Sequence, residues 1–176
     1  MLRFPKGAVG SDIPSFERRD GIDVLYRGES ADVLLVSVGA MAGICVEAAS
    51  QAYREGVGVT VIDPRWVKPL PKSLITMAQR YKGVVVVEDG IKHGGIASTI
   101  SEMFRQEDLQ VPIHSIGVPL EFIEHSKRGE ILVDLGMTAQ NITQQLVAWS
   151  SSDKDDFNSQ AKQFQVDGSE SQKPSR

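Results

Sequence analysis

Cysteine is almost missing from this chain of 176 residues, where Cys45 is the only one. A single cysteine allows no internal disulfide and excludes a cysteine-rich zinc site, so the composition is typical of a reducing, cytoplasmic setting. The three histidines, His93, His114 and His125, are scattered and lack the i, i+4 spacing of a metal-binding pair. We therefore expect no metal site within the chain.

Long apolar runs and an excess of positive charge are also absent. The longest nearly apolar run, 33–46, is shorter than the roughly 20 residues needed to cross a bilayer. The first ten residues, MLRFPKGAVG, hold no apolar stretch of the kind found in secretory signals. The formal net charge is −4, whereas nucleic-acid binders usually carry a basic patch. We expect a soluble cytoplasmic protein that binds neither membrane nor nucleic acid.

What the chain does contain is a regular alternation of strand-like and helix-like segments. Continuous apolar or β-branched runs predict buried strands, and apolar residues at i, i+3, i+4 predict helices. Strands are expected at 22–27, 33–38, 57–62, 83–87 and 111–116, with helices starting near Met41 and covering about 74–81, 96–104 and 138–149. This order predicts an α/β fold with right-handed crossovers. The sheet is expected to be mainly parallel and five-stranded, with helices on both faces and the 22–27 segment as one antiparallel edge strand.

The two ends of the chain differ from this middle part. Residues 1–21 contain three glycines and two prolines among alternating charges, which predicts an irregular arm. Residues 150–176 are rich in Ser, Asp, Gln and Lys and hold few apolar residues, which predicts a disordered tail. The folded domain is therefore expected to span residues 22–149. Within it, Cys45 and His114 fall in apolar patterns and are interpreted as structural residues.

Candidate functional residues gather where strands are predicted to end. Ligands of open α/β sheets bind at the carboxyl ends of the parallel strands, and segments 37–39, 63–69 and 88–95 all fall there. Arg65 and Lys68 in the second segment could hold an anion, but an interface or salt-bridge role is equally compatible with them. A dinucleotide G-x-G-x-x-G, a phosphate-binding G-x-x-x-x-G-K-[ST] and a G-x-S-x-G nucleophile motif are all missing.

The third of these segments is the richest in polar residues and glycine. Glu88 and Asp89 close a predicted strand, and His93, Gly94 and Gly95 open the next helix. Glycines at that place let a ligand or another backbone approach the helix N-terminus, whose free N–H groups favour anions. In a second interpretation the glycines only shape a tight turn and Glu88 forms a buried salt bridge. The residue types leave both open.

Together, several of these motifs resemble the C-terminal domain of 1-deoxy-D-xylulose 5-phosphate synthases, most closely the actinobacterial type. The resemblance covers roughly residues 2–150 and rests on segments that occur in the family's order. They are Arg3-Phe-Pro-Lys-Gly7, Asp63-Pro-Arg-Trp-Val-Lys-Pro69, Val84 to Gly90, His93-Gly-Gly95, Gly117-Val-Pro-Leu-Glu-Phe122 and Gly129 to Ala139. The resemblance implies the fold of a transketolase C-terminal domain.

The family implies a thiamine diphosphate enzyme that condenses pyruvate with D-glyceraldehyde 3-phosphate at the entry to isoprenoid synthesis. In that family an N-terminal domain binds the diphosphate and magnesium through G-D-G followed by an asparagine, and a central domain supplies the glutamate that activates the thiazolium. This chain has only two asparagines, Asn141 and Asn158, and Asp89-Gly90 follows Glu88 instead of glycine. We therefore expect that the chain alone binds no cofactor and is inactive. Its expected partners are a second copy or the missing synthase domains.

Few of the family's functional residues can be carried over, and none is catalytic. Lys6 corresponds to a basic residue that helps bind the phosphate of the aldehyde substrate; Arg3 is the other basic residue of that motif and could equally have a structural role. A lysine offers a point charge where arginine offers a bidentate fork, so the contact at Lys6 is expected to be looser. The remaining residues are predicted to support the site or an interface: Arg65, Lys68, Glu88, Asp89, His93, Gly94 and Gly95.

Two other functions remain open at this point. A free-standing, non-catalytic dimerisation or regulatory module would need the same core patterning and no catalytic domain. A flavodoxin-like ligand carrier is suggested by the strand–helix alternation alone.

Overall fold

The computed structural model describes residues 11–151. The predictions made for Arg3, Lys6 and nearly all of the 150–176 tail lie outside these residues. The described elements are β1 (Glu17–Arg19), β2 (Ile22–Tyr26), β3 (Val33–Val38), the 3-10 turn η1 (Gly39–Met41), α1 (Ala42–Arg54), β4 (Val59–Asp63), α2 (Ser73–Ala78), β5 (Gly83–Ile91), α3 (Ile96–Gln106), β6 (Ile113–Val118), α4 (Arg128–Asp134) and α5 (Ala139–Ser151).

The strands form one mixed sheet in the order β1-β2-β4-β3-β5-β6. Strands β4, β3, β5 and β6 are parallel, and β2 and β1 extend the sheet antiparallel beyond β4. This confirms the predicted fold class. The strand number and the edge differ from the prediction, because Glu17–Arg19 form a sixth strand outside β2. Only three residues pair there, too few for a sequence pattern to reveal.

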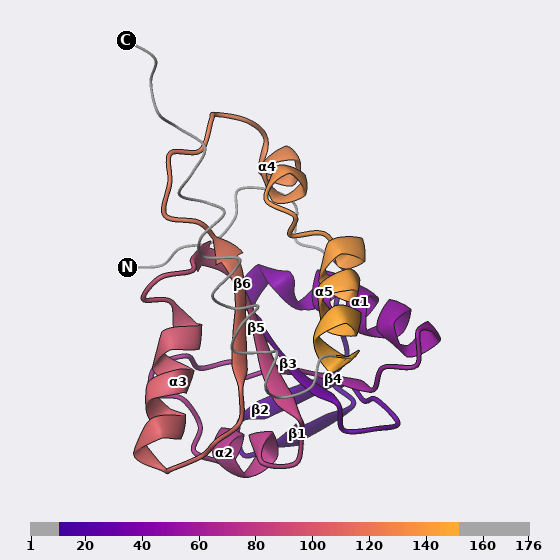
Figure 1. Ribbon diagram of the computed structural model, residues 1–176, viewed down its shortest axis with the longest axis vertical. Coiled ribbons are helices and arrows are strands. Elements are labelled where there is room, and N and C mark those ends of the chain that lie inside the picture. Colours follow the sequence, from indigo (N-terminus) through magenta and orange to yellow (C-terminus); the bar gives the residue numbers. More distant parts are fainter. Residues whose placement is uncertain (1–10, 152–176) are drawn as a thin grey trace.

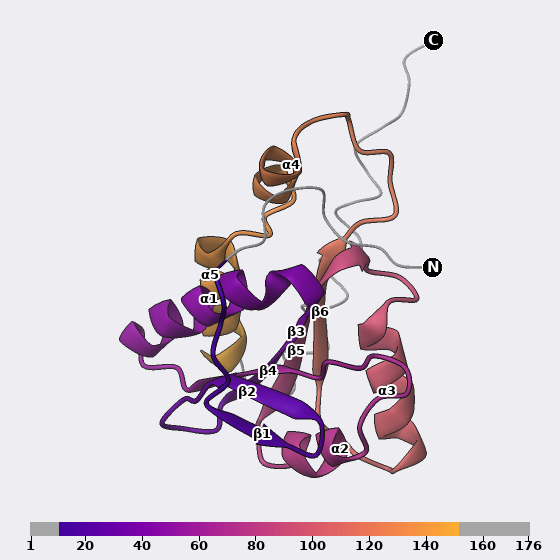
Figure 2. The same ribbon diagram turned by 180° about the vertical axis from the view of Figure 1, so that it is seen from behind.

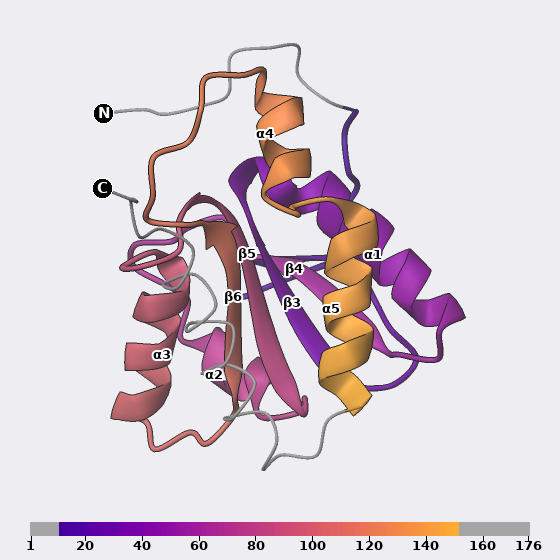
Figure 3. The same cartoon turned by 45° about the horizontal axis from the view of Figure 1, so that its top comes forward.

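Helices cover both faces of the sheet, as Figures 1 and 3 show. One face packs against α1 and α5, which also contact each other, and the opposite face packs against α2 and α3. Alternate residues of β3 serve the two sides: Leu35 lies in the α1–α5 core and Leu34 in the α2–α3 core. A strand buried on both faces is largely apolar, which is why 33–38 is apolar except for Ser37, whose hydroxyl donates to the Ile62 carbonyl at 3.0 Å.

The two residues interpreted as structural lie within this framework. Cys45 is fully buried in α1, and burial raises the pKa of its thiol to about 12, so it behaves as a small core residue. His114 of β6 is half-buried, and its Nε2 lies 3.3 Å from the Gln145 side-chain oxygen on α5. Burial lowers the pKa of His114, and Lys92 adds to this while the bond to Gln145 opposes it.

Gly56 and Thr138 mark the end of one helix and the start of another. Gly56 follows α1 with φ of 80°, and its N–H donates to the Tyr53 carbonyl. Thr138 precedes α5, and its hydroxyl accepts from the Asn141 N–H at 3.2 Å. No helix among residues 11–151 is long and apolar enough to cross a membrane.

One helix was not predicted, and several elements end later than expected, β5 and α5 among them. Helix α4 lies in the stretch 117–137, where no element was predicted; Leu132 is its only buried residue, so its periodicity is weak. Strand β5 does not close at Glu88 but continues to Ile91 through a register shift after Val87. Helix α5 extends to Ser151, two residues into the predicted tail.

Candidate functional site

The carboxyl ends of the parallel strands meet at one edge, as predicted. Val38 pairs with Glu88 and Ile91 with Val118, so β3, β5 and β6 end side by side. After β3 the chain passes to β4 on one side, and β5 then lies on the other side of β3. The topological switch point of the parallel strands is therefore between β3 and β5, where ligands of such folds commonly bind. The loop 88–95 begins there.

Glu88 is buried at this switch point, with 7% of its surface exposed. Its side-chain oxygen Oε1 accepts a hydrogen bond of 2.9 Å from the Ile96 N–H in the first turn of α3. Burial raises the pKa of Glu88, while the backbone N–H groups of Ile96 and Ala97 act in the opposite direction. Within residues 11–151 no cation pairs with this carboxylate, so the salt bridge proposed in one of the two interpretations does not form. Glu88 instead accepts a hydrogen bond from a free N–H group at the N-terminus of α3 and places its negative charge at the positive end of the helix dipole.

The glycines of this loop have different tasks. A Cβ atom on Gly95 would lie 2.0 Å from Glu88 Oε1 and 2.7 Å from the Ile91 carbonyl, so only glycine fits beside the buried carboxylate. Gly94 instead has open space around it, and glycine is favoured there because the backbone adopts a φ of 75°, which other residues rarely adopt. Glu88 itself fills the approach to the helix that a ligand would need. This supports the turn-shaping interpretation of the loop.

Asp89 forms a contact that the sequence did not reveal. Its Oδ2 accepts hydrogen bonds from Arg128, at 2.9 Å from Nε and 2.7 Å from Nη2. Arg128 is the first residue of α4, so the pair connects the end of β5 to a helix 39 residues further along the chain. In Figure 1, α4 lies beyond the end of β6, over this edge of the sheet. The pair positions α4 there.

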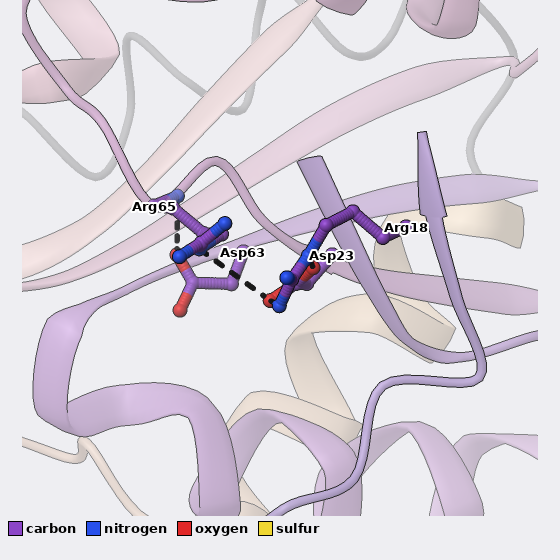
Figure 4. A network of polar contacts seen from close by, with 4 residues as sticks. All are labelled: Arg18, Asp23, Asp63 and Arg65. Atoms are coloured by element: carbon purple, nitrogen blue, oxygen red, sulfur yellow. Dashed lines mark hydrogen bonds and ion pairs between the residues drawn. The ribbon is translucent and has the colours of Figure 1, made fainter. Parts of the chain in front are cut away.

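The loop after β4 is held by charged groups near the surface (Figure 4). Arg65 has φ of 57°, its N–H donates to Asp63 Oδ1 at 2.7 Å, and its Nε lies 3.7 Å from Asp23 Oδ2. Asp23 on β2 also accepts from Arg18 Nε on β1 at 2.5 Å. The hydrogen bond from Arg18 lowers the pKa of Asp23, partial burial opposes it, and the charges of Arg18 and Arg65 add to the lowering. Arg65 therefore anchors its loop to the antiparallel edge.

The remaining predicted residues are exposed. His93 and Lys68 form no ion pair with any residue in the range 11–151. The structure thus brings Glu88, Gly94 and Gly95 into one compact turn, and it places Arg65 with β1 and β2.

Exposed apolar side chains are the feature of this edge that the sequence analysis missed. Phe122 is fully exposed, Leu120 is 71% exposed and Trp66 is 68% exposed. Ile91 at the end of β5 and Val133 on α4 are also largely exposed. Trp66 follows β4, and Leu120 and Phe122 follow β6. Ile91 is the last residue of β5, and Val133 lies in α4. Leu120-Glu-Phe122, an apolar pair in a turn-rich segment, was the available signal. Exposed apolar groups gathered at one end of a domain mark interaction sites.

The described residues do not fit a magnesium-bound diphosphate. In the part of the chain that the structure describes, no three side chains of His, Cys, Asp and Glu lie close enough to share a metal ion. At the switch point a buried carboxylate closes the helix N-terminus, and its negative charge would oppose a phosphate group.

Comparison with known proteins agrees with this architecture. Residues 23–142 match the family described as transketolase, C-terminal domain. The chain is 46% identical over 151 residues to the 1-deoxy-D-xylulose-5-phosphate synthase of Mycobacteroides abscessus, and 46% identical over 150 residues to that of Rhodococcus jostii. These alignments cover 84% of this chain but only 24% and 23% of the relatives, so the chain spans about a quarter of their length. The predicted resemblance to actinobacterial synthases is confirmed.

Solved structures give the same result. A structure described as "Split gene transketolase, inactive beta4 tetramer" superimposes with a TM-score of 0.66 and 26% identity, over 77% of this chain and 45% of that one. The transketolase of Campylobacter jejuni superimposes with a TM-score of 0.53 at 14% identity over 78% of this chain and 20% of that one, which shows the fold alone. The match to the family over 23–142 and the shared architecture lead to one conclusion. This chain belongs to the transketolase C-terminal domain family and is homologous to the C-terminal part of 1-deoxy-D-xylulose-5-phosphate synthases.

Proposed function

We propose that this chain is the assembly domain of a 1-deoxy-D-xylulose-5-phosphate synthase and does not catalyse the condensation alone. The observation that carries the proposal is the 46% identity to synthases over 84% of the chain, which corresponds to only a quarter of their length. The remaining three quarters of the synthase would bind thiamine diphosphate and magnesium and would supply the catalytic groups. Its proposed location is the cytoplasm, because a chain with a single cysteine suits a reducing compartment.

The carboxyl edge supports an assembly role. Exposed Leu120, Phe122 and Trp66 would become buried against another part of the synthase, and burying a side chain of this size stabilises a complex by about 1.5–3 kcal/mol. Beneath them, Glu88 and Gly95 fix the loop after β5, and Arg128 fixes α4. In this proposal these residues shape the docking surface and take no chemical step. A rigid surface lowers the entropy lost on docking.

An activity assay of the purified chain tests the inactivity. The chain is incubated with pyruvate, D-glyceraldehyde 3-phosphate, thiamine diphosphate and magnesium, and the release of carbon dioxide is followed. We expect no release above the protein-free control, and the synthase of Mycobacteroides abscessus serves as the positive control. Turnover by the purified chain, persisting in a second independent preparation, would refute the proposal.

Self-association is a second candidate function, as a free-standing dimerisation or regulatory module. One observation favours it: the split-gene relative, which is 26% identical to this chain, is described as an inactive beta4 tetramer. The mass of the chain in solution, measured by light scattering, distinguishes the two. A mass of at least twice 19.2 kDa supports a self-associating module, and a monomer at high concentration contradicts it.

Lys6 and Arg3 keep their proposed role in binding the aldehyde phosphate, which depends on the complete synthase. In a synthase assembled from this chain and the missing parts, Lys6→Ala should raise the KM for glyceraldehyde 3-phosphate and leave the KM for pyruvate unchanged. An equal change in both constants would contradict a phosphate contact.

A further inference from the structure

A cavity of about 440 Å³ lies against the antiparallel strands of the sheet, and no residue of the loop 88–95 lines it. It is bordered by β1, β2, α2 and the turn 28–31 that precedes β3. Figure 2 shows α2 beside β1 and β2, on the side away from α4. Pockets of roughly 300–1,000 Å³ are the usual size for small-molecule sites. Nothing in the proposed assembly role uses this cavity.

Three arginines line the cavity, and two of them have no ionic partner among the described residues. Arg27 forms an ion pair with Glu17, and its guanidinium lies 5.0 Å from the centre of the Phe16 ring. Arg19 and Arg80 pair with no carboxylate of residues 11–151. Two unpaired guanidinium groups at one cavity offer several N–H donors to an anion, and arginine suits phosphate and carboxylate because it binds them in a bidentate manner.

The cavity lining holds as many acids as arginines, three of each, so it carries no net positive charge. Glu17 is neutralised by Arg27, and Glu29 accepts a 3.0 Å hydrogen bond from Tyr53 of α1, on the other face of the sheet. Asp20 has no partner among residues 11–151, so Asp20 and Glu29 equal the two free arginines in charge but form no ion pair with either of them. A bound anion would give Arg19 and Arg80 the ionic contacts that no described carboxylate supplies.

The rest of the lining suits an organic ligand better than a bare ion. Val24 and Met77 contribute apolar surface from β2 and α2, and Thr76 lies on the same helix. We propose that this cavity binds a small organic anion, a phosphomonoester or a carboxylate with an apolar body, through Arg19 and Arg80. The charged group would bind the arginines, and the body would cover Val24 and Met77.

A titration of the isotope-labelled full chain, followed by amide NMR at constant ionic strength, tests this proposal. The probes are phenyl phosphate, benzoate and inorganic phosphate. Either organic probe should shift the amides around the cavity, with an affinity on the order of millimolar for so small a ligand. Comparing the two organic probes tells phosphate from carboxylate preference. Shifts absent from the cavity for both, or binding of inorganic phosphate as tight as theirs, would overturn the proposal.

Matched variants separate a specific site from general charge attraction. Arg19→Gln and Arg80→Gln should each weaken binding by about fivefold, because each removes charged donors from a partly exposed site. Arg54→Gln, which removes the same charge from α1 on the other face, should leave the affinity unchanged. Asp20→Asn should strengthen binding by about twofold, since it removes the unpaired acid. An equal loss of affinity in all three arginine variants would show that only the overall charge of the protein matters, and it would contradict a specific site.

Discussion

The loops after β5 and after β4 leave the same edge of the sheet but are held in opposite ways. After β5, the buried Glu88 carboxylate accepts from the first turn of α3 and fits against Gly95 with no room to spare. After β4, Arg65 pairs with Asp23, and the arginine is exposed to solvent while the Asp23 carboxylate is partly buried. Exposed ion pairs contribute little, whereas a buried charge must be satisfied or it costs several kcal/mol.

This difference indicates that one loop is a fixed part of the fold and the other is easily altered. Steric fit and burial determine the loop after β5, so changes there should reach the whole domain. The loop after β4 depends on screened charges, so changes there should stay local. Substitutions in the two loops should therefore differ in both size and reach.

Gly95→Ala should destabilise the domain by about 2–3 kcal/mol, because the new methyl group would force Glu88 or the Ile91 carbonyl to move. Chemical denaturation measures the free energy of unfolding. The matched control is Gly94→Ala, which meets no atoms but must adopt a positive φ and should cost about 1 kcal/mol. Equal losses would show that the carboxylate contact at Gly95 is unimportant.

Glu88→Ala should cost about 1–2 kcal/mol, because it leaves the Ile96 N–H without its acceptor at a partly buried helix N-terminus. Glu88→Gln keeps an accepting oxygen and should lose less than half as much. Hydrogen exchange of the first turn of α3 should accelerate in the alanine variant. If the glutamine variant were the less stable of the two, hydrogen bonding would not explain the role of Glu88.

The pH dependence of the two loops should have opposite sign. Because burial raises the pKa of Glu88 above its ordinary 4.5, the folded state takes up this proton first. The advantage of the wild type over Glu88→Gln should therefore grow as pH falls from neutral through the folded pKa towards 4.5. Denaturation curves over that range measure it, and a shrinking advantage would contradict the sign.

Asp23→Asn should have a smaller effect, below about 1 kcal/mol, because its partners are exposed. The hydrogen bond from Arg18 lowers the pKa of Asp23, so its contribution should be full above the ordinary value of 3.8 and disappear as pH falls through the folded pKa. The loss should also shrink in high salt. A salt-independent loss as large as that of Gly95→Ala would remove the contrast between the loops.

Arg128→Gln should change global stability least, because its pair with Asp89 is partly exposed. Its expected effect is local: faster hydrogen exchange in α4 with unchanged exchange in α3. Arg105→Gln, which breaks an exposed pair within α3, is the control and should leave α4 unchanged. Protection of α4 that survives the loss of Arg128 would show that other contacts position this helix.

The sequence predicted those parts of the fold that depend on burial on both faces. The apolar runs of β3 and β5 and the small-residue face of α1 are dictated by packing, so their pattern is visible. Strand β1 and helix α4 bury almost nothing, and α4 shows no clear periodicity. The pair of Asp89 and Arg128 joins residues 39 apart, a contact that only the folded chain determines.

The candidate site was predicted in place but only partly in detail. The carboxyl edge follows from the βαβ order, so the position of the 88–95 loop could be deduced. Whether Glu88 forms a salt bridge or accepts hydrogen bonds from a helix N-terminus depends on which groups pack around it, and either interaction can stabilise a buried carboxylate. The exposed apolar pair Leu120 and Phe122 could have been noticed, since apolar residues in a turn-rich segment have no core to enter.

The central claim is that the carboxyl edge docks onto the rest of a synthase. The most direct measurement is product formation by the Mycobacteroides abscessus synthase lacking its C-terminal quarter, with this chain added in trans. The relative's own C-terminal piece is the positive control that validates the assay. We predict that the wild-type chain raises turnover at least tenfold and that Leu120→Ser with Phe122→Ser abolishes the gain, whereas Phe16→Ser, similarly exposed elsewhere, does not. Restoration by the relative's piece but not by this chain, or equal restoration by the double variant, would contradict the claim.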